Sequence, residues 1–182
     1  MTLKEKVSRK LENLKEYVGY LKGYQSRTIE DLKRDPTLRG AVERYLHLSA
    51  ECVIDVAEIM ISELSLRKPE EYKESIDILG EVGIIPDEFA FHFSPVAGFR
   101  NILVHEYAKI DLAEVHRHLQ KDLGDFEKFS KYIIDYLDSN HSKASLLLPG
   151  YQLFREEYLC LQQYKYSFQY ALNKCHRTAH PL

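Results

Sequence analysis

The sequence lacks the residues and runs on which several classes of protein depend. It has no tryptophan and three cysteines, Cys52, Cys160 and Cys175, none of them in a C-x-x-C pair, so a disulfide framework is not expected. No apolar run approaches the roughly 20 residues that cross a membrane, and the first residues have no apolar signal-peptide core. We therefore expect a cytoplasmic protein with no membrane association.

The sequence also lacks an excess of positive charge and the common phosphate- and metal-binding motifs. The formal net charge is −3, so any nucleic-acid binding must come from a local patch and not from a basic molecule. No glycine-rich phosphate loop, H-E-x-x-H pair or serine-centred elbow is present. We expect no cofactor and no metal.

What is present is apolar residues at helical spacing along most of the 182 residues. Val7, Leu11, Leu14, Val18 and Leu21 recur every three or four positions, and similar stripes follow. The pattern predicts an all-α protein of four to five helices, with Asp35 and Asp111 as helix caps. The expected ranges are about 2–33, 36–66, 70–83, 86–107 and 111–138.

A polar break at residues 139–142 separates the expected domain, 1–140, from an extension, 141–182. From Lys143 the extension has five Lys/Arg and two acidic residues, and its apolar residues keep helical spacing. We expect an extra C-terminal helix with a mobile end, docked on its own subunit or on a second copy; binding of RNA is the alternative. Cys175, His176 and His180 have no fourth ligand nearby, which argues against a zinc site.

The segment from Arg100 to Tyr107 places a guanidinium, an amide, an imidazole and a phenol within eight positions. Asn101 and His105 are four residues apart and share a helix face. Arginine suits phosphate because its planar fork of donors is permanently charged, and histidine can exchange a proton near neutral pH. Such a pair could cleave RNA without a metal. The alternative is that Arg100 and His105 cap a helix end or face solvent.

Arg100-Asn101-Ile-Leu-Val-His105-Glu-Tyr107 resembles the R-x4-H-x-Y signature of HEPN-domain proteins, specifically the HepT toxin family. The likeness extends upstream to Glu43-Arg44-Tyr45-Leu46, Ile84-Ile85-Pro86 and Val96-Ala97-Gly98-Phe99, and downstream to Lys109-Ile110-Asp111. It covers roughly residues 1–140. The resemblance implies a HEPN-type helical bundle that forms a homodimer and acts as a metal-independent endoribonuclease. It implies the toxin of a type VII toxin–antitoxin system, with RNA, tRNA among the candidates, as substrate and an MntA-like nucleotidyltransferase as antitoxin.

The resemblance also implies roles for individual residues. Arg100 and His105 would be catalytic, Asn101 would support them, and Tyr107 would accept an adenylyl group from the antitoxin. Arg44 and His47, on the polar side of the second expected helix, are either a solvated face or part of the cleft of the dimer. The other function considered is a non-catalytic helical HEPN partner that binds a nucleotide or the nucleotidyltransferase.

Overall fold

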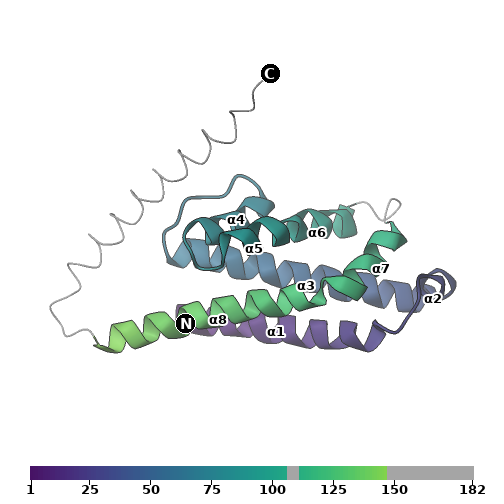
Figure 1. Ribbon diagram of the computed structural model, residues 1–182, viewed down its shortest axis with the longest axis horizontal. Coiled ribbons are helices and arrows are strands. Elements are labelled where there is room, and N and C mark those ends of the chain that lie inside the picture. Colours follow the sequence, from purple (N-terminus) through teal and green to yellow (C-terminus); the bar gives the residue numbers. More distant parts are fainter. Residues whose placement is uncertain (106–110, 147–182) are drawn as a thin grey trace, which may run out of the picture. The chain divides into compact units, whose positions relative to one another are not determined.

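The computed structural model describes the backbone of residues 1–105 and 111–146, and the side chains of 1–100 and 111–139. These ranges contain helices and no strand, which confirms the expected all-α class (Figure 1). The chain divides into two compact units, Met1–Ile134 and Asp135–Leu182, and the fold and site described below belong to the first. The helices are α1 Leu3–Tyr24, α2 Ile29–Arg34, α3 Pro36–Glu63, α4 Tyr72–Glu81, α5 Asp87–Phe93, α6 Pro95–His105, α7 Leu112–Lys121 and α8 Leu123–Leu146.

The two long helices α1 and α3 pack side by side, and α3 lies between α1 and the helices α4 and α6 (Figure 1). The apolar stripe of α1 is buried, and α3 buries residues on more than one side because α1, α4, α6 and α7 all contact it. Cys52, on α3, is buried, and burial raises the pKa of its thiol to about 11. An inert, protonated thiol at this position acts as a small apolar side chain.

Local capping chemistry sets several helix ends. Thr2 and Glu5 form a reciprocal capping box at the start of α1. The Asp35 carboxylate accepts hydrogen bonds from two backbone N–H groups at the start of α3, and Asp111 accepts one at the start of α7. Both predicted aspartate caps are therefore confirmed.

Three predicted helices, those over 2–33, 86–107 and 111–138, are wrong in extent because each is interrupted. The helix expected over 2–33 ends at Tyr24, and Thr28 and Asp31 form a second capping box that starts α2. The helix expected over 111–138 breaks at Asp122, which separates α7 from α8. The polar break expected at 139–142 is also wrong, since α8 continues to Leu146. The domain boundary at 140/141 stays a prediction, and residues 147–182 lie outside the described residues.

The path from α4 to α6 brings the Arg100 segment onto the bundle. Gly80, on α4, lies so close to α5 that an added Cβ would be 2.6 Å from the Cβ of Ala90. Gly83 follows with a φ of 72°, which favours glycine. The single helix expected over 86–107 is divided at Ser94-Pro95, because α5 ends at Phe93 and α6 begins at Pro95.

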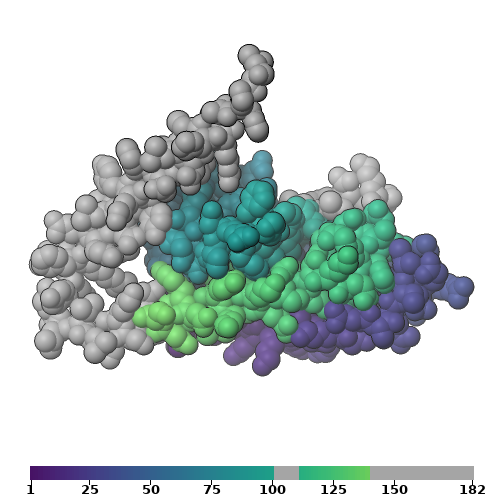
Figure 2. All heavy atoms as spheres, in the orientation of Figure 1, coloured from purple at the N-terminus to yellow at the C-terminus, as the bar shows by residue number. Residues whose placement is uncertain are grey.

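Aromatic side chains attach α5 to the first part of α8. The Phe93 ring packs against those of Phe126 and Phe129, at centroid distances of 5.5 and 5.7 Å, and Phe89 packs against Tyr132. On the face drawn in Figure 2, the teal residues of α5 and α6 lie against the green residues of α7 and of the start of α8. Among the described residues, no helix is long and apolar enough to cross a membrane.

Candidate functional site

The candidate site is centred on Arg100, whose side chain extends from α6 to the middle of α3. The Arg100 side chain is 18% exposed, and its Nε donates to Oε2 of Glu51 over 2.5 Å. The guanidinium carbon also lies 5.5 Å from the centre of the Tyr72 ring, at the start of α4. An arginine within about 6 Å of an aromatic ring is attracted by the ring's electrons. Residues from two other helices, α3 and α4, therefore fix the position of the Arg100 side chain.

A line of polar residues on α3 continues from this ion pair. His47 is one helical turn before Glu51, and its Nε2 lies 3.9 Å from Glu51 Oε2. Arg44 donates from Nη1 to His47 Nδ1 over 3.1 Å. Because a guanidinium only donates, Nδ1 is the acceptor, and the neutral imidazole carries its proton on Nε2, on the side of Glu51. The order of contacts is Arg44, His47, Glu51, Arg100.

Two groups in this line, the Glu51 carboxyl and the His47 imidazole, have lowered pKa values. The hydrogen bond from Arg100 is the largest cause that lowers the pKa of the Glu51 carboxyl. Burial, followed by the charge of Arg44, lowers the pKa of His47, and the attraction of Glu51 opposes this only in part. His47 is therefore neutral at pH 7. Its Nε2 is buried and has no hydrogen-bond partner among the described residues.

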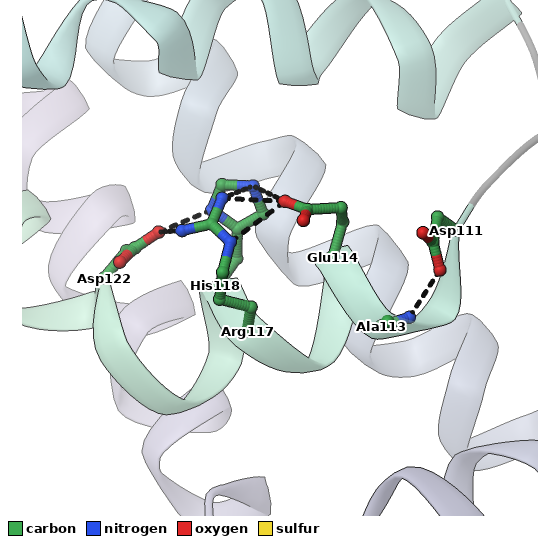
Figure 3. A network of polar contacts seen from close by, with 6 residues as sticks. All are labelled: Asp111, Ala113, Glu114, Arg117, His118 and Asp122. Carbon is green, nitrogen blue, oxygen red and sulfur yellow. Dashed lines mark hydrogen bonds and ion pairs between the residues drawn. The ribbon is translucent and has the colours of Figure 1, made fainter.

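A second polar network braces α6 from the side of α7 (Figure 3). The His118 ring lies 3.9 Å, centre to centre, from the ring of Phe99, the residue before Arg100. Figure 3 shows Arg117 and Asp122 converging on this imidazole: Arg117 donates to Nε2 over 3.1 Å, and Nδ1 lies 2.7 Å from Asp122 Oδ2. Glu114 pairs with Arg117. The His118 imidazole is thus held in place by Arg117 and Asp122 at its two nitrogens and by the Phe99 ring against it.

From the sequence alone, His116 and His118 are expected to be exposed on the helix predicted over 111–138, and the structure shows that this is wrong. His118 is 17% exposed at its side chain, and burial is the largest cause that lowers its pKa. His116 is also partly buried, with Nε2 lying 3.1 Å from the carbonyl oxygen of Arg27. His118 connects α7 to α6 through Phe99, and His116 connects α7 to the segment before α2 through the Arg27 carbonyl.

The structure brings some of the sequence-predicted site residues together and leaves others outside its description. Arg44 and His47 lie in one chain of contacts with Arg100. The backbone of α6 is helical through Asn101 and His105, which places Arg100 and His105 about 7.5 Å apart along one helix axis. The side chains of Asn101 and His105, and all of Tyr107, lie outside the described residues.

Sequence reasoning missed Glu51 and Tyr72 as members of the site. A signal for Glu51 was available, because Arg44, His47 and Glu51 recur at helical spacing on a helix that is otherwise strongly apolar. No comparable signal existed for Tyr72, which meets Arg100 through the packing of α4 on α6.

The donors in the described part of the chain suit an anion better than a cation. No group of three histidine, cysteine or acidic residues within the described ranges is arranged to hold a metal ion. The guanidinium groups of Arg44 and Arg100 instead offer charge-assisted hydrogen bonds of the kind that bind phosphate.

Comparison with known proteins assigns the chain to a family. A family model described as ribonuclease HepT-like matches residues 9–133. The chain belongs to the HepT-like ribonuclease family. Its expected membership of the HEPN group and its expected class of enzyme, a ribonuclease, are thereby confirmed.

Relatives and solved structures agree with this assignment. The chain is 28% identical over 131 residues to the tRNA nuclease HepT of Aphanizomenon flos-aquae, which covers 72% of this chain and 89% of that protein. It is 31% identical over 97 residues to the mRNA nuclease HepT of Shewanella oneidensis, covering 53% and 73%. A solved structure of a tri-AMPylated S. oneidensis HEPN toxin in complex with its MNT antitoxin matches with a TM-score of 0.66 and 25% identity, covering 74% of this chain and 99% of that one. These matches support a HepT-like ribonuclease toxin of a toxin–antitoxin system.

Proposed function

We propose that this HepT-like protein is a homodimeric, metal-independent endoribonuclease toxin that an MntA-like nucleotidyltransferase neutralises. The observation that carries the proposal is the Arg100 guanidinium, held in place by Glu51 and Tyr72 and followed on the same helix by His105. This matters because a hydrogen-bond donor that is already in position stabilises the charge that develops in the transition state most effectively. In a dimer, two copies of α6 would line one cleft.

The reaction would be a transesterification within the RNA strand. His105 takes the proton of a ribose 2′-hydroxyl, the 2′-oxygen forms a bond to the adjacent phosphorus, and the bond from phosphorus to the 5′-oxygen of the next nucleotide breaks. The products are a 2′,3′-cyclic phosphate and a 5′-hydroxyl, the latter receiving a proton from an acid in the cleft or from water. Arg100 stabilises the negative charge that grows on the phosphoryl oxygens.

Arg44, His47 and Asn101 would have supporting roles. Arg44 is exposed and lies two helical turns from Glu51 on the same face of α3, about 10.5 Å along its axis, where it could bind a phosphate beside the one being cleaved. His47 keeps the Arg44 guanidinium in place through its Nδ1 atom. Asn101, one turn before His105 on α6, would orient that imidazole.

Neutralisation would follow from the position of Tyr107. The tyrosine oxygen attacks the α-phosphorus of ATP, pyrophosphate leaves, and the phenol proton passes to a base of the nucleotidyltransferase. An AMP group two residues from His105 brings negative charge and bulk to the site, and both effects oppose the binding of substrate phosphate. The similar S. oneidensis HEPN toxin, which is described as tri-AMPylated, supports this proposal.

The proposal is tested by incubating purified protein with total tRNA or with mRNA, in the presence and absence of EDTA. We expect cleavage that EDTA does not prevent and that leaves 2′,3′-cyclic phosphate ends. Arg100→Ala should reduce the rate by about 10²–10³-fold, the loss typical of one charge-stabilising donor. His105→Ala should reduce it by about 10²–10⁴-fold, the contribution typical of a general base. The matched controls are Arg9→Ala on α1 and His92→Ala on α5, both exposed positions.

Circular dichroism would establish that all four variants are folded. If Arg100→Ala and His105→Ala remain helical and cleave RNA as fast as the controls, the assigned catalytic pair is wrong. If the wild-type protein binds the nucleotidyltransferase but cleaves no RNA, the protein is a non-catalytic HEPN partner.

A further inference from the structure

Tyr72 is a large aromatic side chain that the fold leaves on the surface beside Arg100. It is 48% exposed, although it begins α4 next to a well-packed core. Tyr20 and Phe91 are also exposed, at 45% and 62%, but their ring contacts are with Tyr45 and His92. Tyr72 is distinguished by its position, with its ring 5.5 Å from the guanidinium carbon of Arg100.

Tyr72 is also presented on a fixed support. Arg67, in the connection before α4, donates to both carboxylate oxygens of Glu81 over 3.0 and 2.8 Å and to Glu74 over 2.7 Å. These bonds clamp the connection to α4, and the Ser75 hydroxyl bonds the carbonyl of Tyr72 over 2.6 Å. A fixed aromatic ring loses little conformational freedom when a ligand covers it.

We propose that Tyr72 is a base-stacking subsite for single-stranded RNA, occupied by the base of a nucleotide adjoining the phosphate at Arg100. This inference rests on the proposed ribonuclease function and adds to it the way in which the substrate strand is held. Proteins that bind single-stranded RNA stack unpaired bases on aromatic side chains and on arginine planes, and here both groups lie in contact. Because every base has a π face, the subsite tolerates many sequences and selects for unpaired ones.

The alternative to this subsite is that Tyr72 acts only by steadying Arg100. The two roles differ in what they require of the RNA. Steadying Arg100 matters for every substrate, whereas stacking matters only when the RNA has a base at the facing position. An RNA with one abasic nucleotide therefore separates them.

The experiment measures the Kd of the full-length protein for a short RNA that contains one mapped cleavage site, made uncleavable by a 2′-deoxy nucleotide there. We expect Tyr72→Ala to weaken binding by roughly 5- to 150-fold, the value of one stacked base, and Tyr72→Phe to bind almost normally. Tyr20→Ala is the matched control, since Tyr20 is equally exposed but lies on α1, and it should bind as the wild type does.

The same RNA is then made abasic at each position next to the cleavage site in turn. At one position we expect the wild type to lose as much affinity as Tyr72→Ala does, with no further loss when the two changes are combined. If Tyr72→Ala weakens binding by the same factor on every abasic RNA, or does not weaken binding to any RNA, the inference is wrong. Either outcome leaves Arg100-dependent cleavage intact. A wild-type protein that neither binds nor cleaves RNA overturns the proposed function as well.

Discussion

The Nε atom of Arg100 donates to Oε2 of Glu51 across 2.5 Å, joining α6 to the centre of α3. A charge-assisted bond of this kind is about twice as strong as a neutral one, and it aims the rest of the guanidinium. Glu51 therefore acts on the proposed reaction through Arg100, as a positioning residue.

Glu51→Gln should lower kcat for RNA cleavage by about tenfold, equivalent to ~1.4 kcal/mol, because glutamine keeps the shape but loses the charge that aims Arg100. The KM should change less than kcat. Glu63→Gln is the matched control, as Glu63 is also an ion-paired glutamate of α3 but pairs with Lys6. Equal kcat values for Glu51→Gln and Glu63→Gln would show that Glu51 does not position Arg100.

His118→Ala should also reduce kcat, because the imidazole supports Phe99 directly before Arg100. His118→Phe keeps a ring against Phe99 and should restore part of the rate. Val115→Ala, a buried change on the same helix that does not remove this ring contact, controls for general loss of stability. The measurement is kcat alongside the thermal midpoint. A loss of rate that merely follows the midpoint in all three variants would contradict a positioning role.

The close contact of α4 and α5 makes Gly80 intolerant of a side chain. Gly80→Ala should destabilise the protein by about 1–3 kcal/mol, the usual effect of overpacking, because the new methyl would meet the Cβ of Ala90 at 2.6 Å. Gly19→Ala, with open space around it on α1, should instead stabilise by about 0.5–1 kcal/mol through helix propensity. Urea denaturation followed by circular dichroism measures the free energy of unfolding of both variants. The prediction fails unless the two variants change it in opposite directions.

Features of the fold that depend on residues close together in the sequence could be predicted more readily than those that depend on distant ones. The helix starts at Asp35-Pro36 and Asp111 could be predicted because capping is local. The break before Thr28 also has a local signal, the Thr28-Asp31 capping box, which sequence reasoning missed because the break contains no glycine or proline. The break at Asp122 likewise contains no glycine or proline, and the Asp122 side chain is bonded there to Arg117 and His118.

The same distinction applies to the site. Arg100 and His105 lie on one helix, so their spacing was readable from the sequence. Glu51 and Tyr72 come from α3 and α4, and only the packing of three helices brings them to Arg100. A sequence motif identifies groups on one element, whereas the residues that hold those groups come from elsewhere in the fold.

Stability should fall as the pH drops below about 6.5. The pKa values of His47 and His118 are lowered in the folded protein, chiefly by burial, so the unfolded chain binds protons that the folded chain does not. The stability that the two histidines contribute is fully present above the ordinary histidine pKa. It is lost as the pH falls from that value to their lowered pKa values in the folded protein.

Urea midpoints measured between pH 7.5 and 5.5 should therefore decrease for the wild type and decrease less for the double variant His47→Gln, His118→Gln. His92→Gln, at an exposed position on α5, should follow the wild type. A double variant with the same slope as the wild type would show that these two histidines do not titrate on unfolding.

Tyr107 should be the residue that receives AMP, because the proposed mechanism needs a modified hydroxyl beside His105. Co-expression with an MntA-like nucleotidyltransferase, followed by mass spectrometry of the digested protein, should show an AMP-sized increment on the peptide that contains Tyr107. Tyr107→Phe removes the attacking hydroxyl, so this variant should stay unmodified and should keep arresting growth when the antitoxin is present. Tyr20→Phe serves as the control, as it changes an exposed tyrosine on α1 and should leave both modification and neutralisation intact. An unmodified Tyr107 in cells where the antitoxin nevertheless stops the toxin would mean that neutralisation works through binding alone.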